Sequence, residues 1–252
     1  MLAGALMEWY GREARDLPWR RTRDPYAILV SEVMLQQTQV ARVVGRWEAW
    51  LERWPDAASL AAAPVADVLA AWVGLGYNRR ALRLREACLV VAEHGWPEDL
   101  RSLPGIGPYT AAAVGAFAFG RDELPVDTNV ARVLERTGWT PSHTPPALGQ
   151  AVMELGAVVC RAREAACAIC PVAHGCASAN AVVVAPRARS GQGGRERFED
   201  SNRWVRGRVI EALAAGTGLP AGIEPERLQR AVSGLVRDGL VERGADGFRL
   251  PV

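Results

Sequence analysis

The chain has 252 residues, of which 49% are hydrophobic, and its formal net charge is only +2. This length and apolar content suffice for a folded core, and the charge alone does not indicate a nucleic-acid binder. The N-terminal segment lacks the basic start, apolar run and cleavage site of a signal peptide, and no apolar run is long enough to cross a bilayer, so we expect a cytoplasmic protein without membrane contact.

Helical periodicity dominates the chain as far as about residue 180. Asp24 and Pro25 are typical of a helix N-cap followed by proline at the first helical position, and we expect one helix from there through residue 54. A tight turn at LPGIG, residues 103–107, separates two later helices. Further helices are predicted over residues 64–73, 78–94, 108–120, 127–139 and 147–160.

The last part of the chain has a different composition. Residues 181–203 are polar and rich in glycine and arginine, which is typical of a linker. Two predicted helices, 205–215 and 225–242, precede a hairpin that turns at Ala245-Asp246-Gly247, and together they indicate a small winged-helix-like module over residues 204–252. Such a module either contacts DNA or only packs on the main body, and the sequence favours neither.

Four cysteines with the spacing C-x6-C-x2-C-x5-C form the most distinctive pattern. Such sets hold tetrahedral zinc or an iron–sulfur cluster. Only Cys167 and Cys170 form a tight knuckle, whereas Cys160 and Cys176 reach in over longer arms, which suits a bulky cluster better than a single ion. Two disulfides are the alternative, disfavoured because nothing marks the chain as secreted. The fifth cysteine, Cys88, is expected to be a buried structural thiol.

The LPGIG turn resembles the helix-hairpin-helix of DNA repair proteins. Gly105 and Gly107 let the backbone turn tightly and approach a ligand closely. The helix that begins near Pro108 then offers free N–H groups and a positive dipole end to a phosphate, which is recognition without sequence preference. An ordinary helical corner is the alternative, and VDTNV at residues 126–130 argues against it.

Together, LPGIG, VDTNV, the cysteine loop and SEVMLQQTQV at residues 31–40 resemble the endonuclease III and MutY family of DNA glycosylases. SEVMLQQTQV resembles the MutY adenine glycosylases in particular. The resemblance implies an all-α, two-lobed endonuclease III-like fold with a 4Fe–4S cluster on the four cysteines. It also implies a six-helix barrel over residues 21–130 and a cluster domain that combines residues 1–20 with 131–180.

Two carboxylates are the candidates for the chemistry. Glu32 is surrounded in sequence by Val30, Val33 and Met34, so its pKa should be raised and it could hold a proton for a departing adenine. Asp127 matches the family aspartate that stabilises positive charge on the sugar. Asn129 could orient Asp127 or the attacking water by hydrogen bonding. The plain alternatives are a solvent-facing glutamate and a helix-capping aspartate.

Tyr109 occupies the position at which the bifunctional endonuclease III branch has its catalytic lysine. All 30 basic residues are arginine, so no lysine is available for a Schiff base. The resemblance therefore implies a monofunctional glycosylase that leaves an abasic site. Thymine mismatch glycosylases share this tyrosine, so Tyr109 excludes one branch without choosing between the other two.

The resemblance also assigns residues to DNA contacts. Gln36 and Gln37 would enter the duplex from the minor groove, and Tyr77 would wedge beside the lesion base, although Asn78 stands where relatives often have a second tyrosine. Arg161 and Arg163 in the cysteine loop would face the DNA backbone.

A pocket for the flipped adenine is implied by four further residues. Trp19 would stack on the base, and Arg20 and Gln150 would hydrogen-bond its edge, with Glu154 as a further candidate. A core tryptophan, a surface arginine and an exposed glutamine are equally ordinary interpretations.

The sequence thus predicts a monomeric, cytoplasmic, nucleoid-associated DNA glycosylase. Its substrate would be double-stranded DNA in which adenine is mispaired with 8-oxoguanine or guanine. A thymine or uracil mismatch glycosylase and a non-catalytic, redox-sensing DNA-binding protein are the alternatives. Residues 181–252 are too few for the MutT-like domain with which many MutY proteins read the opposite base, which leaves selectivity for 8-oxoguanine open.

Overall fold

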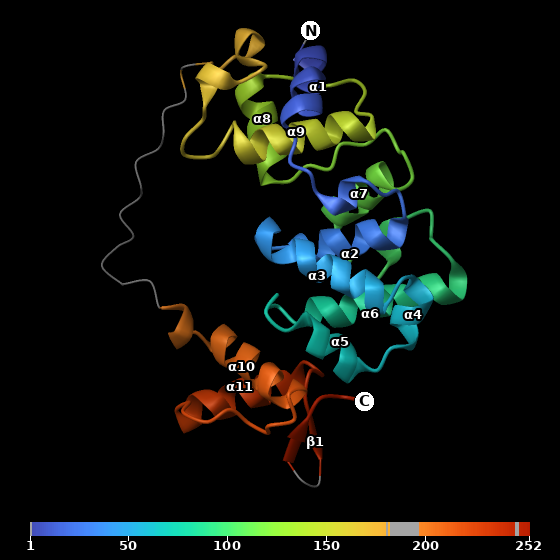
Figure 1. Cartoon of the computed structure of the whole chain (residues 1–252), viewed down its shortest axis with the longest axis vertical. Coiled ribbons are helices and arrows are strands. Elements are labelled where there is room, and N and C mark those ends of the chain that lie inside the picture. The colour runs from blue at the N-terminus through green and yellow to red at the C-terminus, as the bar shows by residue number, and fades with distance from the viewer. Residues whose placement is uncertain (1, 180, 182–196, 245–246) are drawn as a thin grey trace. The chain divides into compact units, whose positions relative to one another are not determined.

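The computed structural model describes residues 2–179, 181, 197–244 and 247–252 of the chain. Helices account for nearly all of its regular structure, which confirms the predicted all-α class (Figure 1). Contacts divide it into two compact units, Met1–Glu32 with Gly107–Gly191, and Val33–Ile106 with Gln192–Val252. No helix in the described part of the chain is long and apolar enough to cross a membrane. The predicted barrel and cluster domains stay a prediction.

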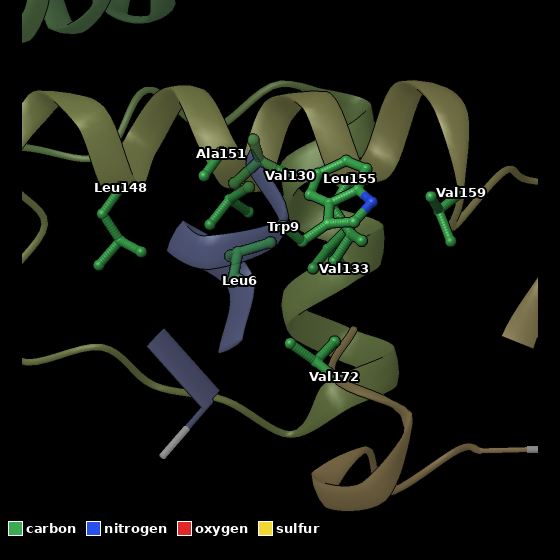
Figure 2. Packing of buried hydrophobic residues seen from close by; sticks show 10 residues of the cluster. Leu6, Trp9, Val130, Val133, Leu148, Ala151, Leu155, Val159 and Val172 are labelled. Atoms are coloured by element: carbon green, nitrogen blue, oxygen red, sulfur yellow. The ribbon is translucent and has the colours of Figure 1, made fainter. Parts of the chain in front are cut away.

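The first unit is built around two long helices and the N-terminal helix. Apolar residues of α1, α8 and α9 form its core, with Trp9 packed among Val133 and Leu155 (Figure 2). Val172 of the cysteine loop joins the same core, so the loop is anchored to it. The helices of this unit are α1 (Leu2–Glu13), α7 (Pro108–Phe117), α8 (Thr128–Thr137) and α9 (Pro146–Val158), with short 3-10 turns at Pro18–Arg20, Cys167–Ile169 and Ala173–Gly175.

The second unit combines four helices of the main body with the C-terminal segment. Trp50 packs edge to face on both Trp54 and Trp72 in its core, and all three rings are buried. Cys88 is completely buried and its pKa is raised by burial to about 12, as expected for an inert structural thiol. The helices are α3 (Val40–Arg53), α4 (Ala57–Ala62), α5 (Val65–Trp72) and α6 (Arg79–His94), with a 3-10 turn at Leu100–Ser102.

The prediction of one unbroken helix through residue 54 is wrong. Helix α2 (Pro25–Leu35) begins as predicted, with the Asp24 carboxylate accepting the N–H of Tyr26 at 3.0 Å, but it ends at Leu35. Helix α3 begins only at Val40, and Gln37 between them has a φ of 56°, a left-handed conformation that no helix continues. The glutamine pair therefore lies on a connecting loop instead of a helix face.

The C-terminal module has the predicted order of elements. Helices α10 (Asn202–Ala214) and α11 (Pro225–Arg237) pack together and precede an antiparallel hairpin of β1 (Glu242–Gly244) and β2 (Gly247–Arg249). A 3-10 turn at Phe198–Asp200 leads into α10, and α10 packs on α5 of the same unit. Most of the predicted linker, residues 182–196, and the turn residues 245–246 lie outside the described residues.

Candidate functional site

Glu32 lies on α2 with its side chain almost entirely removed from solvent, at 6% exposure. Burial raises the pKa of Glu32 to about 7; a hydrogen bond from Tyr109 opposes this shift and the charge of Asp127 adds to it. The interpretation of Glu32 as a solvent-facing helical residue is therefore wrong, and the expected raised pKa is found. A carboxyl group with this pKa is partly protonated at neutral pH, so it can both give and take a proton.

Tyr109 lies one residue after the proline that starts α7, and its hydroxyl hydrogen-bonds Glu32. Burial raises the pKa of Tyr109 strongly, and the charges of Glu32 and Asp127 raise it further. The phenol is consequently a neutral hydrogen-bond donor at physiological pH. Glu32, Tyr109 and Asp127, which are far apart in the sequence, thus form one electrostatically coupled group.

Asp127 is the N-cap of α8. Its Oδ1 accepts the backbone N–H groups of Asn129 and Val130 at 2.9 and 2.7 Å, and its Oδ2 accepts the Asn129 side-chain amide at 2.8 Å. The capping role is therefore real, and the same hydrogen bonds fix the position of the carboxylate. Asn129 thus hydrogen-bonds Asp127 through its side chain, the first of the two roles expected for it.

Arg132, which the sequence analysis did not single out, ties this group to the cysteine loop. Its Nη2 donates to Asn129 Oδ1 at 2.8 Å and to the Gly156 carbonyl at 2.7 Å, while its Nε donates to the Cys160 carbonyl at 2.8 Å. A side chain on Gly156 would lie 2.8 Å from Asn129 Cβ, so α8 and α9 approach closely here. The available signal was the position of Arg132 one helical turn after Asn129.

Glu154 is completely buried on α9 and forms ion pairs with two arginines. Arg15 donates through Nε and Nη2 at 2.7 and 2.9 Å, and Arg20 donates through Nη2 at 2.6 Å. Burial alone would raise the pKa of Glu154, but the hydrogen bonds from Arg15 and Arg20 outweigh it and hold the pKa at about 2. Arg20 is therefore a structural partner of Glu154, at 15% side-chain exposure, and not a surface residue.

The other predicted pocket residues lie beside this ion group. Gln150 accepts a hydrogen bond from the Tyr10 hydroxyl at 3.0 Å, and Arg20 lies over the Tyr10 ring at 5.5 Å. Trp19 is buried at 8% exposure in the 3-10 turn that precedes Arg21. The structure thus brings together Arg20, Gln150 and Glu154, and Tyr10 and Arg15 are members that sequence reasoning missed.

The four cysteines line one cavity in the first unit. Arg136 contacts both ends of the set: its Nη1 donates to Cys160 Sγ at 3.5 Å, and its carbonyl accepts from Cys176 Sγ at 3.4 Å. No three His, Cys, Asp or Glu side chains among residues 2–179, 181, 197–244 and 247–252 are grouped as a ready-made ion site. Four thiols on one shared cavity are a donor set that fits an iron–sulfur cluster.

The two loop arginines expected to face DNA are exposed. Arg161 is 3.6 Å from Glu164, and both side chains are open to solvent, so this ion pair is weak. Arg163 is also exposed. Arg136 contributes as well, because it donates to the Arg161 and Ala162 carbonyls at 2.8 and 3.0 Å and so shapes the loop that presents these arginines.

The residues expected to enter DNA lie in the second unit. Gln37 and Tyr77 are the described non-glycine residues with positive φ, at 56° and 49°, and such conformations are strained. Tyr77 is 42% exposed, and its hydroxyl accepts a hydrogen bond from Arg203 at 2.7 Å.

Arg80 holds both strained loops and was not predicted. Its Nη1 donates to the Val33 and Gln36 carbonyls at 2.7 and 2.6 Å, and its Nη2 donates to the Leu75 and Gly76 carbonyls at 3.0 and 2.9 Å. One guanidinium therefore closes the glutamine loop and the tyrosine loop together. No signal in the single sequence distinguished Arg80 from its neighbour Arg79.

The LPGIG turn has the expected backbone. Gly105 has a φ of 76°, and a Cβ there would lie 2.6 Å from Arg83 Cβ, so only glycine fits. Gly107 is the N-cap residue of α7, and a Cβ there would meet nothing within 4 Å. The Cβ position of this residue, which directly precedes the first turn of α7, is therefore open.

Comparison with known proteins places this arrangement among DNA repair enzymes. Residues 30–157 match the model of the HhH-GPD superfamily base excision DNA repair proteins. The chain is 41% identical to the adenine DNA glycosylase of Mycolicibacterium smegmatis, an alignment that covers 96% of this chain and 93% of that protein. The chain is also 43% identical to the human adenine DNA glycosylase, and that alignment covers 69% of this chain and 38% of the human protein.

Solved structures give the same fold. A thermostable thymine-DNA glycosylase matches 71% of this chain and 95% of its own with a TM-score of 0.65 at 25% identity. Endonuclease III trapped as a covalent intermediate with DNA matches 71% of this chain and 94% of its own with a TM-score of 0.60 at 22% identity. The predicted endonuclease III-like fold is confirmed.

Proposed function

This chain belongs to the HhH-GPD superfamily of base excision DNA repair proteins and, within it, to the MutY-type DNA glycosylases, and we propose that it removes adenine mispaired with 8-oxoguanine or guanine by hydrolysing the N-glycosidic bond. The observation that carries the proposal is Glu32, a buried glutamate with a pKa of about 7, coupled to Asp127. The substrate would be double-stranded DNA containing the mispair, bound by a monomer.

Glu32 would act first as the acid. Its carboxyl group, neutral in a good part of the molecules at pH 7, gives a proton to N7 of the flipped adenine, which turns the base into a good leaving group. The resulting carboxylate then accepts a proton from the attacking water. Tyr109 donates to Glu32 throughout and so holds the carboxyl group in one orientation.

Asp127 would serve as the negative charge beside the sugar. As the glycosidic bond breaks, positive charge develops on the sugar, and a fixed carboxylate stabilises it. Three hydrogen bonds from Asn129 and Val130 hold Asp127 before the reaction begins, so little reorganisation is needed. Because the chain contains no lysine and has Tyr109 in the lysine position, water is the proposed nucleophile and an abasic site the product.

The four cysteines would hold a 4Fe–4S cluster. When bound, the cluster would join the ends of the loop covalently through four thiolates. Arg136 and Arg132 hold the loop to α8, and Arg161 and Arg163 would meet the DNA backbone from it. Analysis of purified protein for iron and acid-labile sulfide tests this, and zinc without sulfide would contradict it.

The adenine pocket would use Trp19, Arg20, Gln150 and Glu154. Glu154 and Arg20 already satisfy each other, so the donors and acceptors that remain on Arg20 and Gln150 would meet the base edge. The structure supports this as a coherent group of side chains in one unit.

The test uses four duplexes that carry A opposite 8-oxoguanine, A·G, T·G or U·G. Each is incubated with the protein and heated in alkali, which cleaves the strand at abasic sites. Cleavage at the adenine strand of the first two is expected. Cleavage only at T·G or U·G would establish the thymine or uracil alternative, and tight binding without any cleavage would establish the non-catalytic one. Glu32→Gln provides the matched inactive control.

A further inference from the structure

The second unit contains a groove of about 850 Å³. Its walls are the loop that carries Gln37, the loop that carries Tyr77, and helix α10 of the C-terminal module. The groove thus brings two residues that the family resemblance assigns to DNA next to a segment to which nothing assigns a role.

The groove is strongly basic. Its lining includes the arginines of α3, α6 and α10 against one carboxylate, Glu211. Glu211 pairs with Arg208 at 2.7 Å, and Asp238 pairs with Arg206 at 2.6 Å. Within the described chain, neither Arg42 nor Arg203 has a carboxylate at ion-pair distance. The six lining arginines are Arg42, Arg79, Arg80, Arg203, Arg206 and Arg208.

Aromatic rings lie beside these uncompensated charges. The Arg203 guanidinium is 5.1 Å from the centre of the Tyr77 ring and 4.9 Å from that of Phe198, and it donates to the Tyr77 hydroxyl at 2.7 Å. Tyr77 and Phe198 are 42% and 51% exposed. Exposed rings next to arginines in a basic groove are the combination with which proteins bind unstacked nucleic acid.

The tyrosine is held in this place from both sides. Arg203 of the C-terminal module bonds its hydroxyl, and Arg80 fixes the carbonyls of Leu75 and Gly76 just before it. The strained backbone of Tyr77 is therefore maintained by contacts from the main body and from the module together. An ordinary packing contact of the module would not need an exposed, strained tyrosine.

We propose that this groove is a DNA-binding site of the enzyme, in which Arg42 and Arg203 contact backbone phosphates next to the mispair and the rings of Tyr77 and Phe198 stack on an adjoining base. The C-terminal module is then a working part of the DNA interface. The inference rests on the proposed glycosylase function, because DNA is its ligand.

Gly207 allows a test that leaves the fold intact. It lies on α10 in the groove lining, and a Cβ there would meet nothing within 4 Å. Gly207→Glu adds a negative charge to the groove, whereas Gly207→Ala adds only the carbon. A second pair removes one positive charge each: Arg42→Gln inside the groove and Arg237→Gln, exposed on α11 outside it.

Binding of a duplex with A opposite 8-oxoguanine is measured by fluorescence anisotropy over a salt series, with the full chain in a Glu32→Gln background to prevent turnover. Gly207→Glu should weaken binding about tenfold at low salt, and Arg42→Gln should lower the slope of log Kd against log salt by about 1. Gly207→Ala and Arg237→Gln should bind like the parent. Equal binding by Gly207→Glu, Arg42→Gln and their controls would overturn the proposal.

Single-turnover excision by the same variants with Glu32 intact separates this proposal from the glycosylase assignment. With enzyme in excess of DNA, Gly207→Glu should slow excision at enzyme concentrations below saturation and recover the parent rate at saturating enzyme, because the groove binds DNA and does no chemistry. If the parent cuts none of the four duplexes, the proposed function fails while the anisotropy series still tests the groove. If Gly207→Glu lowers the saturating rate instead, a binding role is refuted.

Discussion

Two buried glutamates of the first unit show how differently this chain treats the same side chain. Glu32 on α2 and Glu154 on α9 are 6% and 0% exposed. The surroundings of Glu32 supply a phenol and a second carboxylate, and its pKa rises to about 7. The surroundings of Glu154 supply two arginines, and its pKa falls to about 2 despite the burial.

The difference shows that burial alone does not determine what a carboxyl group does. Removal from water favours the neutral form, and only nearby cations or several donors reverse that preference. Glu154 is therefore a permanent anion that joins α9 to the segment around Arg15 and Arg20. Glu32, which has no ion-pair partner among the residues that the structure describes, changes protonation near neutral pH and is suited to proton transfer.

The largest effect of a single substitution is expected for Glu32→Gln. Glutamine keeps the size of the side chain but neither gives nor takes a proton in this way, so the single-turnover rate of base excision should fall by about 10²- to 10⁴-fold. Glu48→Gln, an exposed carboxylate on α3, should leave the rate unchanged. A Glu32→Gln protein that excises at the parent rate would remove Glu32 from the mechanism.

Glu154→Gln should lower the stability of the fold more than the rate of base excision. The change leaves Arg15 and Arg20 without their buried counter-charge, which should lower the free energy of unfolding by about 3 kcal/mol. The measurement is urea denaturation at pH 7. Glu8→Gln is the matched control, because the Glu8–Arg12 pair is exposed and should contribute less than about 1 kcal/mol. Equal losses in the two variants would contradict the assignment.

The two glutamates also differ in how far the sequence could predict them. Val30, Val33 and Met34 beside Glu32 indicated an apolar environment, and the raised pKa follows from it. The arginines of Glu154 come from a segment near the N-terminus, so no local pattern around Glu154 indicated them. Partners that meet only through tertiary packing are not visible in one sequence.

The same limit applies to the fold. Helices with a cap or a strong periodicity, such as α2 and α8, began where the sequence predicted. The break at residues 36–39 was missed because those residues include no glycine or proline, and the left-handed Gln37 is supported by Arg80 from α6. The order of elements in the C-terminal module was predictable, but its groove with Tyr77 was not.

The two glutamates should make the stability of the protein depend on pH in opposite ways. The pKa of Glu32 is raised from 4.5 to about 7, so the folded protein binds this proton more tightly, and stability is lost as pH rises through that range. Between pH 5 and 8, the free energy of unfolding of Glu32→Gln should therefore rise relative to that of the parent, by a total approaching about 3 kcal/mol. A constant difference across this range would contradict the buried, titrating carboxyl group.

Glu154 should show the opposite dependence in the same titration. Its pKa is lowered from 4.5 to about 2, so its contribution is present at neutral pH and is lost as pH falls through that range. The Glu154→Gln and parent curves should thus converge in acid. Convergence at alkaline pH instead would reverse the assignment of the two groups.

The finest distinction concerns the hydroxyl group beside each glutamate. Tyr109 donates to Glu32 and opposes the rise of its pKa, so Tyr109→Phe should raise that pKa further. If protonated Glu32 is the acid, the alkaline fall in single-turnover rate should move to higher pH by about one unit or less. Tyr10→Phe is the matched control, because the Tyr10 hydroxyl donates to Gln150 beside Glu154 and has no part in this proton transfer. An unchanged alkaline limb in Tyr109→Phe, or one that moves to lower pH, would mean that a group other than Glu32 controls the rate.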